Sequence, residues 1–107
     1  MSKIYLGTEL KLNVNIDPIG GIHMDSYDWK VELFTSPSKI VTVSSDDTDN
    51  ALRQDEDNYI IKADTKAIGI GKLKCRVTAY IPDGDFSDYK RTEVQLYNPS
   101  IDIIKAD

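Results

Sequence analysis

Three aspartates close together are the residues of this sequence with the clearest potential for chemistry. Asp83, Asp85 and Asp88 lie in the stretch IPDGDFSDYKRTEV, with Gly84 between the first two. Carboxylates at this spacing offer oxygen ligands for a calcium ion. An EF-hand loop needs Gly at its sixth position and Glu at its twelfth, whereas a loop counted from Asp83 has Asp88 and Val94 there. We therefore favour a solvated turn, with Gly84 at a positive φ, over a metal site.

Two long polar loops carry most of the remaining ionisable side chains. Residues 17–26 include the only histidine, His23, and residues 44–58 hold six acids and Arg53. A zinc site needs three or four ligands, and one His, one Cys and scattered carboxylates do not supply them at a recognised spacing. We interpret His23 as a surface residue and the acidic loop as a solvated, mobile segment. Binding of a cation or of a basic protein surface is the alternative for the acidic loop.

Catalysis has no candidate machinery in this sequence. Cys75 is predicted to face inward, where a thiol is an apolar filler rather than a nucleophile. The sequence shows no Cys–His or Ser–His–Asp arrangement that would activate a nucleophile. Carboxylate pairs of the glycosidase type would lie in loops or on outward strand positions, where nothing raises a pKa. We predict a non-enzymatic protein with no cofactor.

The composition limits the class of protein and of partner. The chain has 107 residues, which is enough for one domain (1–107). From its initial Met we expect a complete small protein, and a cut-out domain with an added Met is the alternative. The net charge of -5 argues against a nucleic-acid partner, because such binders carry a basic patch. A single cysteine excludes an internal disulfide. No apolar run has the length of a signal peptide or a membrane span, so we expect a soluble protein without a membrane partner.

Alternation of apolar and polar residues is the dominant pattern along the chain. The stretch LKLNVNI, for example, places Leu10, Leu12, Val14 and Ile16 on one face, as in a half-buried strand. The predicted strands are 10–16, 27–34, 39–44, 58–63, 71–81, 91–98 and 100–105, with a short edge strand at 3–6. A single helical turn is predicted over 64–69, with Asp64 as its cap. This pattern predicts an all-β fold, an Ig-like β-sandwich of about seven antiparallel strands.

Three residues have the spacing of an immunoglobulin core. Val14, Trp29 and Cys75 follow one another at fifteen and forty-six residues, close to the Cys–Trp–Cys spacing of an Ig domain. Val14 replaces the first Cys, so an apolar contact is expected where the disulfide would be. Leu73 occupies the position of the conserved corner tyrosine, so that corner is absent. We interpret Trp29 as a core residue.

The C-terminal third adds a resemblance to a known group of proteins. The segment GIGKLKCRVTAYIPDGDFSDYKRTEVQLYNPSIDII resembles small structural proteins of tailed phages that infect gut Bacteroidetes, the crAss-like group included. The carrying motifs are the glycines before Leu73, the stretch IPDGDFSDYKRTEV and the closing SIDII. The front segment YLGTELKLNVNI is similar to the start of Ig-like phage modules. The resemblance implies a virion protein that decorates the capsid or belongs to a head fibre or tail attachment.

The resemblance also implies a mechanism and a set of partners. A preformed sandwich would dock on the major capsid protein or on head-fibre subunits at the phage head surface, after synthesis in the host cytoplasm. Loops at the ends of a sandwich commonly carry binding. The predicted contact residues are Asp83, Asp85, Phe86, Asp88, Tyr89 and Arg91.

An alternative function is left open by the aromatic residues of the same region. A carbohydrate-binding or adhesive module would use Tyr80, Phe86 and Tyr89 for stacking, with calcium in the acidic turn. For the phage structural protein that the resemblance implies, Arg91 and Glu93 are expected to point the same way and to pair with neighbours or with a partner subunit.

Overall fold

The computed structural model describes residues 2–106 as an all-β protein, so the first and last residues of the predicted domain lie outside that range. Ten strands and one short helix follow one another along this part of the chain. The strands are β1 (Ser2–Tyr5), β2 (Glu9–Asn15), β3 (Asp28–Ser36), β4 (Lys39–Ser44), β5 (Ala51–Asp55), β6 (Asn58–Asp64), β7 (Gly71–Lys72), β8 (Lys74–Pro82), β9 (Lys90–Tyr97) and β10 (Ile101–Ile104). The helix α1 spans Thr65–Ile68, and a 3₁₀ turn spans Met24–Ser26. No helix among these residues has the length and apolar character needed to cross a membrane.

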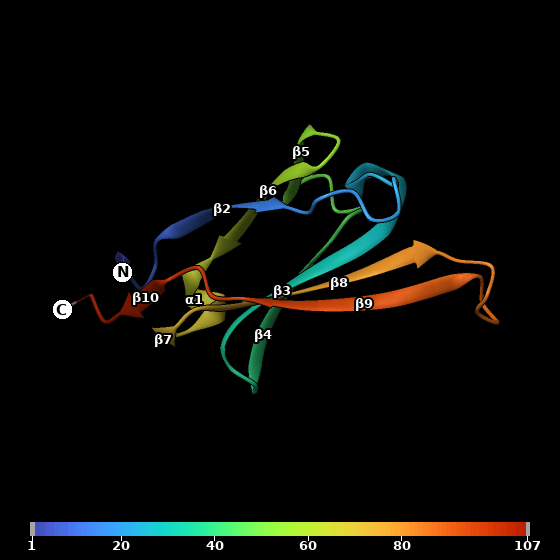
Figure 1. Ribbon diagram of the computed structural model, residues 1–107. Helices are drawn as coiled ribbons and strands as arrows, with labels where there is room; N and C mark the ends of the chain where they lie inside the picture. The colour runs from blue at the N-terminus through green and yellow to red at the C-terminus, as the bar shows by residue number, and fades with distance from the viewer. Residues whose placement is uncertain (1, 107) are drawn as a thin grey trace.

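Seven of the strands form the two main sheets. One sheet has the order β2-β6-β5 and the other has the order β4-β3-β8-β9, with antiparallel pairing throughout. These orders match the B-E-D and C′-C-F-G sheets of an immunoglobulin domain. Buried residues of both sheets belong to one apolar core, so the two sheets form a sandwich (Figure 1).

The third sheet explains why ten strands are present rather than about seven. It has the order β1-β10-β7 and lies at the end of the molecule where both termini are found (Figure 1). The pairing of β1 with β10 is parallel, so the expectation of purely antiparallel strands is wrong at this edge. The predicted strand 71–81 is divided because Leu73, whose N–H donates to the carbonyl of Ile101 at 2.9 Å, separates β7 from β8.

One strand was not predicted. β5 (Ala51–Asp55) lies inside the acidic segment 44–58, which we interpreted as a mobile loop, and it pairs with β6 as a hairpin. Its sequence ALRQD has little apolar alternation, and most of its residues are exposed. Ala51, however, is buried in the core opposite Ile61. β5 therefore forms because it pairs with β6, and not because its own residues alternate between apolar and polar.

The core confirms the predicted alternation. The expected inward residues of β3 and β8, including Trp29 and Cys75, are at most a few per cent exposed. The Trp29 ring packs edge-on against Tyr59 with ring centroids 4.8 Å apart, an arrangement that stabilises aromatic pairs. Val14 belongs to the same buried cluster as Cys75, so apolar packing replaces the disulfide.

The helical turn also forms as predicted. The Asp64 side chain accepts a hydrogen bond from the Lys66 N–H at 2.9 Å, which is an N-cap contact. Gly69 ends the helix at a φ of +98°, a conformation that glycine adopts without strain.

The molecule is elongated rather than round. Its principal extents are 53 × 27 × 24 Å, and β8 and β9 form a long hairpin whose tip lies at the end opposite the termini (Figure 1). Every residue of β9 is at least partly exposed, whereas the alternate residues of β8 are buried. The hairpin therefore projects one strand beyond the packed core.

Candidate functional site

The turn of the β8–β9 hairpin contains the three predicted aspartates but does not bring their carboxylates together. Asp83 accepts a hydrogen bond from the Asp85 N–H at 3.0 Å, and Asp88 accepts one from the Lys90 N–H at 3.2 Å. Each carboxylate is thus bonded to a backbone group two residues further along, as in an Asx turn. Within residues 2–106 the group of three ligating side chains that could hold a metal ion lies elsewhere.

The left-handed residue of this turn is not the expected glycine. Gly84 is absent from the positive-φ residues of the described chain, whereas Tyr89 has a φ of +60°. Tyr89 makes two backbone hydrogen bonds in this turn. Its N–H donates to the Phe86 carbonyl at 2.9 Å, and its carbonyl accepts from the Asp83 N–H at 2.8 Å. A bulky residue rarely adopts this conformation, so the turn holds Tyr89 in a strained backbone state.

Several predicted contact residues are exposed at this turn. Phe86 is 47% exposed and Tyr89 is 72% exposed. Arg91 lies 3.7 Å from a carboxylate oxygen of both Asp83 and Glu93. Arg91 and Glu93 therefore point the same way, as predicted.

The outer face of β9 adds two exposed apolar residues that sequence reasoning did not single out. Val94 is 56% exposed and Leu96 is 73% exposed, and they pair with Thr78 and Arg76 of β8. The core residues Cys75, Val77 and Ala79 pair with the β9 residues on either side of these two, so Val94 and Leu96 face away from the core. Phe86, Tyr89, Val94 and Leu96 are called the hairpin edge below.

A charged pair on the sheet lies beside the hairpin edge. Arg76 donates two hydrogen bonds to the Glu32 carboxylate, at 3.0 and 2.8 Å, and its guanidinium lies 5.3 Å from the centre of the Phe34 ring. The hydrogen bonds from Arg76 hold the pKa of Glu32 below its usual value, despite partial burial of the carboxyl group. The hydrogen bonds to Glu32 therefore hold the side chain of Arg76, which lies opposite Leu96, in one position.

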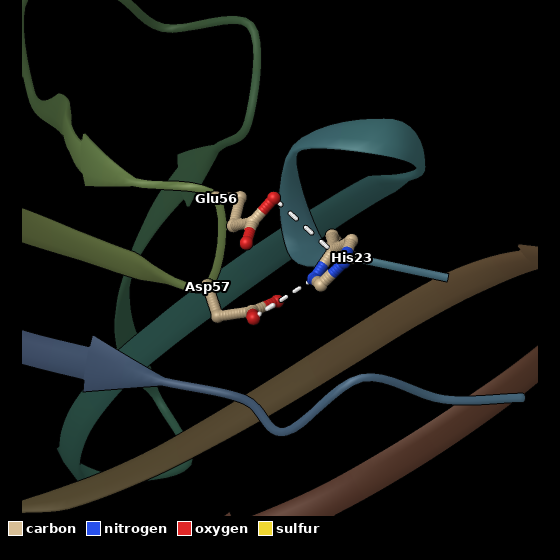
Figure 2. A group of neighbouring side chains, drawn as sticks. All are labelled: His23, Glu56 and Asp57. Atoms are coloured by element: carbon tan, nitrogen blue, oxygen red, sulfur yellow. Dashed lines mark hydrogen bonds and ion pairs between the residues drawn. The ribbon is translucent and has the colours of Figure 1, made fainter. Parts of the chain in front are cut away.

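A second group of ionisable residues joins two segments far apart in the sequence. His23 lies in the loop after β2, and Glu56 and Asp57 form the turn between β5 and β6 (Figure 2). His23 Nδ1 lies 2.9 Å from Asp57 Oδ2, and His23 Nε2 lies 3.7 Å from Glu56 Oε2. One ligating atom from each of the three residues lies within 4.8 Å of the others. These residues are called the His23 cluster below.

The backbone around the His23 cluster is well anchored. The Met24 N–H donates to Asp57 Oδ1 at 3.1 Å, and the Asp25 N–H donates to the Glu56 carbonyl at 3.1 Å. Met24 itself is completely buried in the core. Packing of Met24 therefore anchors the loop 17–26 to the core, and the two hydrogen bonds fasten the loop to the β5–β6 turn.

The electrostatic environment of His23 favours the protonated, positively charged form of its imidazole. The hydrogen bond to Asp57 is the main reason that the pKa of His23 is raised, and the charges of Asp57, Glu56 and Asp25 act in the same direction. Arg53 neutralises part of this field, because its guanidinium donates to Asp25 Oδ2 at 3.2 and 3.0 Å.

Sequence reasoning missed the His23 cluster because it treated His23 as an isolated surface residue. His23 and Asp57 are separated by 34 positions, and only the pairing of β5, β6 and β2 brings their segments together. The segment QDEDN is a run of turn-forming residues between two short strands, and it was the signal for a hairpin at this place.

Cys75 lies in the core as predicted. Its side chain is 2% exposed, and burial raises the pKa of the thiol to about 11. A thiol in this state is a poor nucleophile at neutral pH, so Cys75 serves packing.

No protein-family model, curated protein or solved structure matches this chain. The hairpin edge and the His23 cluster are the surface features that bear on function.

Proposed function

We propose that this chain is a non-enzymatic docking protein that binds a protein partner through the hairpin edge. The observation that carries this proposal is the placement of four exposed apolar side chains on one projecting hairpin. Tyr89 and Leu96, each more than two thirds exposed, gain nothing from the core of the isolated chain. Exposed apolar residues gathered on one segment are typical of a surface that another molecule covers.

The backbone of β9 offers a second kind of contact. β9 pairs with β8 on one side and is the last strand of its sheet. Its outward N–H and C=O groups can accept a strand from a partner, which is a common mode of peptide recognition. Val94 and Leu96 would then add apolar contacts on the outer face of the extended sheet.

The rest of the fold makes this edge a rigid platform. β8 contributes buried side chains along its whole length, among them Val77 and Ile81, and it pairs with β9 over eight residue pairs. A preformed surface loses little conformational entropy on binding, so even a small edge can bind specifically.

The resemblance of the C-terminal third to phage structural proteins supports a virion role for this docking. We propose that the chain decorates the head surface of a tailed phage, with the major capsid protein or head-fibre subunits as partner. A head presents many identical sites, and repeated weak contacts add up where copies are linked. This placement rests on the resemblance, whereas the docking surface rests on the exposed residues.

The proposal is tested first with phage particles and then with single variants. Mass spectrometry of purified particles of the encoding phage is expected to find the chain. In a binding assay on particles stripped of it, Leu96→Lys is expected to weaken binding about tenfold or more, because it places a charge in the centre of the contact. The matched control is Ile70→Lys, because Ile70 is 53% exposed but lies outside the hairpin.

Two results would contradict the proposal. Absence of the chain from purified particles would remove the virion role, and equal binding of the Leu96 and Ile70 variants would remove the hairpin edge as the contact. Binding to immobilised glycans that is lost with Tyr89→Ser would instead support a carbohydrate-binding module, since exposed aromatic rings also stack on sugars.

A further inference from the structure

We propose that the His23 cluster binds one divalent ion of the zinc type, with His23 Nε2 and Glu56 as the protein ligands, water molecules in the remaining coordination positions, and Asp57 orienting the imidazole. This site is separate from the hairpin edge and does not depend on the proposed docking function. The proposal rests on the geometry of three side chains from two segments that the fold brings together (Figure 2).

The imidazole of His23 has carboxylate oxygens at both of its nitrogens. Asp57 Oδ2 lies 2.9 Å from Nδ1, and Glu56 Oε2 lies 3.7 Å from Nε2. A neutral imidazole carries one N–H, so it can donate to only one of these oxygens and turns a lone pair towards the other. A cation between Nε2 and Glu56, either a proton on Nε2 or a metal ion, removes this unfavourable contact between a lone pair and a carboxylate.

The distances fit a metal ion on the Glu56 side of the ring. Zinc lies about 2.0–2.2 Å from nitrogen and carboxylate ligands, so two ligands at a tetrahedral angle are about 3.4 Å apart. The observed separation of 3.7 Å needs only a small closure. The contact of 2.9 Å to Asp57 matches a hydrogen bond from Nδ1–H, which is how carboxylates commonly orient a metal-bound histidine.

Hydrogen bonds fix the position of Asp57, while the side chains of His23 and Glu56 remain accessible to solvent. Asp57 is fixed by the Met24 N–H, and its own N–H donates to Asp55 at 2.9 Å. The side chains of His23 and Glu56 are 38% and 57% exposed, so an ion and its remaining water ligands can reach them. Imidazole with carboxylate favours zinc and similar ions over calcium and magnesium, which prefer oxygen ligands alone.

The test is zinc-dependent stability of the untagged chain at about pH 8, because a pH above the ordinary histidine pKa weakens the competition between protons and zinc for Nε2. Zinc in tenfold excess over its Kd is expected to raise Tm by about 4 °C or more, while calcium and magnesium are expected to have no such effect. His23→Gln and Glu56→Gln should each abolish the rise. Asp85→Asn, which removes an acid from the hairpin turn instead, should retain it.

A spectroscopic readout keeps the test informative if one variant folds poorly. His23 is the only histidine, so its ring signals in an NMR spectrum are unambiguous. Zinc is expected to shift them with one equivalent per chain, and Cys75 cannot compete because it is buried. Unchanged ring signals in wild type, or an equal rise in Tm in both Gln variants, would overturn the proposal. A Tm that depends on pH but not on zinc would overturn it as well.

Discussion

The β8–β9 turn and the His23 cluster are both rich in acids, but the fold uses their carboxylates in opposite ways. In the turn, Asp83 and Asp88 accept hydrogen bonds from backbone groups two residues away. In the cluster, Asp57 accepts hydrogen bonds from the Met24 N–H and from the ring of His23, more than 30 positions away in sequence. Carboxylates that are close in sequence shape their own turn, whereas carboxylates brought together by strand pairing can form a site.

The two regions also differ in how they relate to the core. The His23 cluster is next to Met24, which is completely buried, and to Tyr59, which packs against Trp29. The hairpin edge has its apolar side chains in solvent. Substitutions near the cluster should therefore lower the free energy of unfolding, while substitutions on the hairpin edge should change binding and leave stability nearly unchanged.

The largest expected effect comes from the buried side chain below the cluster. Met24→Ala should lower the free energy of unfolding by about 2–5 kcal/mol, because it leaves a cavity in the core. Phe86→Ala, an apolar truncation of an exposed residue, should change it by less than about 0.5 kcal/mol. Urea denaturation of both variants measures the difference. Equal losses would mean that the loop 17–26 is not anchored as described.

A second, smaller difference is expected between two aspartates. Asp57→Ala removes the acceptor of the Met24 N–H and of His23, so it should lower the free energy of unfolding by about 1–3 kcal/mol. Asp88→Ala removes only the acceptor of the exposed Lys90 N–H and should cost about 0.5 kcal/mol or less. Thermal unfolding of the two variants in parallel checks this order. A reversed order would contradict the contrast between the two acidic regions.

Glu32 provides a third acid, on the sheet itself, with a defined dependence on pH. Because Arg76 holds its pKa below the ordinary value of 4.5, folding is stabilised when Glu32 is ionised. This stabilisation is fully present above pH 4.5 and is lost as the pH falls through the lower pKa of the folded state. Glu32→Gln should therefore lower Tm at neutral pH, and the difference from wild type should shrink in acid. A difference in Tm that stays constant with pH would contradict a stabilising role for the ionised Glu32 carboxylate.

Much of the fold could be predicted from the sequence because alternation reports which side of a strand is buried. Leu33 and Val77 lie in the core as the pattern requires, and Asp64 caps the helical turn. The pattern says little about partners, so β5 and the parallel pairing of β1 with β10 were missed. Both depend on contacts between distant parts of the chain.

The candidate sites were harder to predict for the same physical reason. Asp83, Asp85 and Asp88 drew attention because they are neighbours in sequence, yet the turn separates their carboxylates. Asp25 is the acid nearest to His23 in sequence, but the carboxylate that bonds to the ring belongs to Asp57, which lies 34 positions away until the strands bring it there. Spacing along the chain predicts a site only where one turn or one strand holds all of its residues.

The smallest expected effect concerns the strained backbone of the hairpin turn. Tyr89 and Ser100 are the non-glycine residues with positive φ in the described chain, at +60° and +59°. Replacing either by glycine relieves steric strain of about 1 kcal/mol, which the greater freedom of glycine in the unfolded chain partly offsets. Both Tyr89→Gly and Ser100→Gly should therefore raise Tm slightly or leave it unchanged.

Binding then separates these two variants. Tyr89 is 72% exposed and belongs to the hairpin edge, so Tyr89→Gly should weaken docking, while Ser100→Gly should not. A strained residue whose side chain is in solvent has no structural reason to be tyrosine, and a role in contact supplies one. If Tyr89→Gly lowered Tm by several degrees instead, the side chain would be needed for folding. Tyr89 would then contribute to the stability of the fold, as the residues of the His23 cluster do, and its exposure would no longer be an argument for binding.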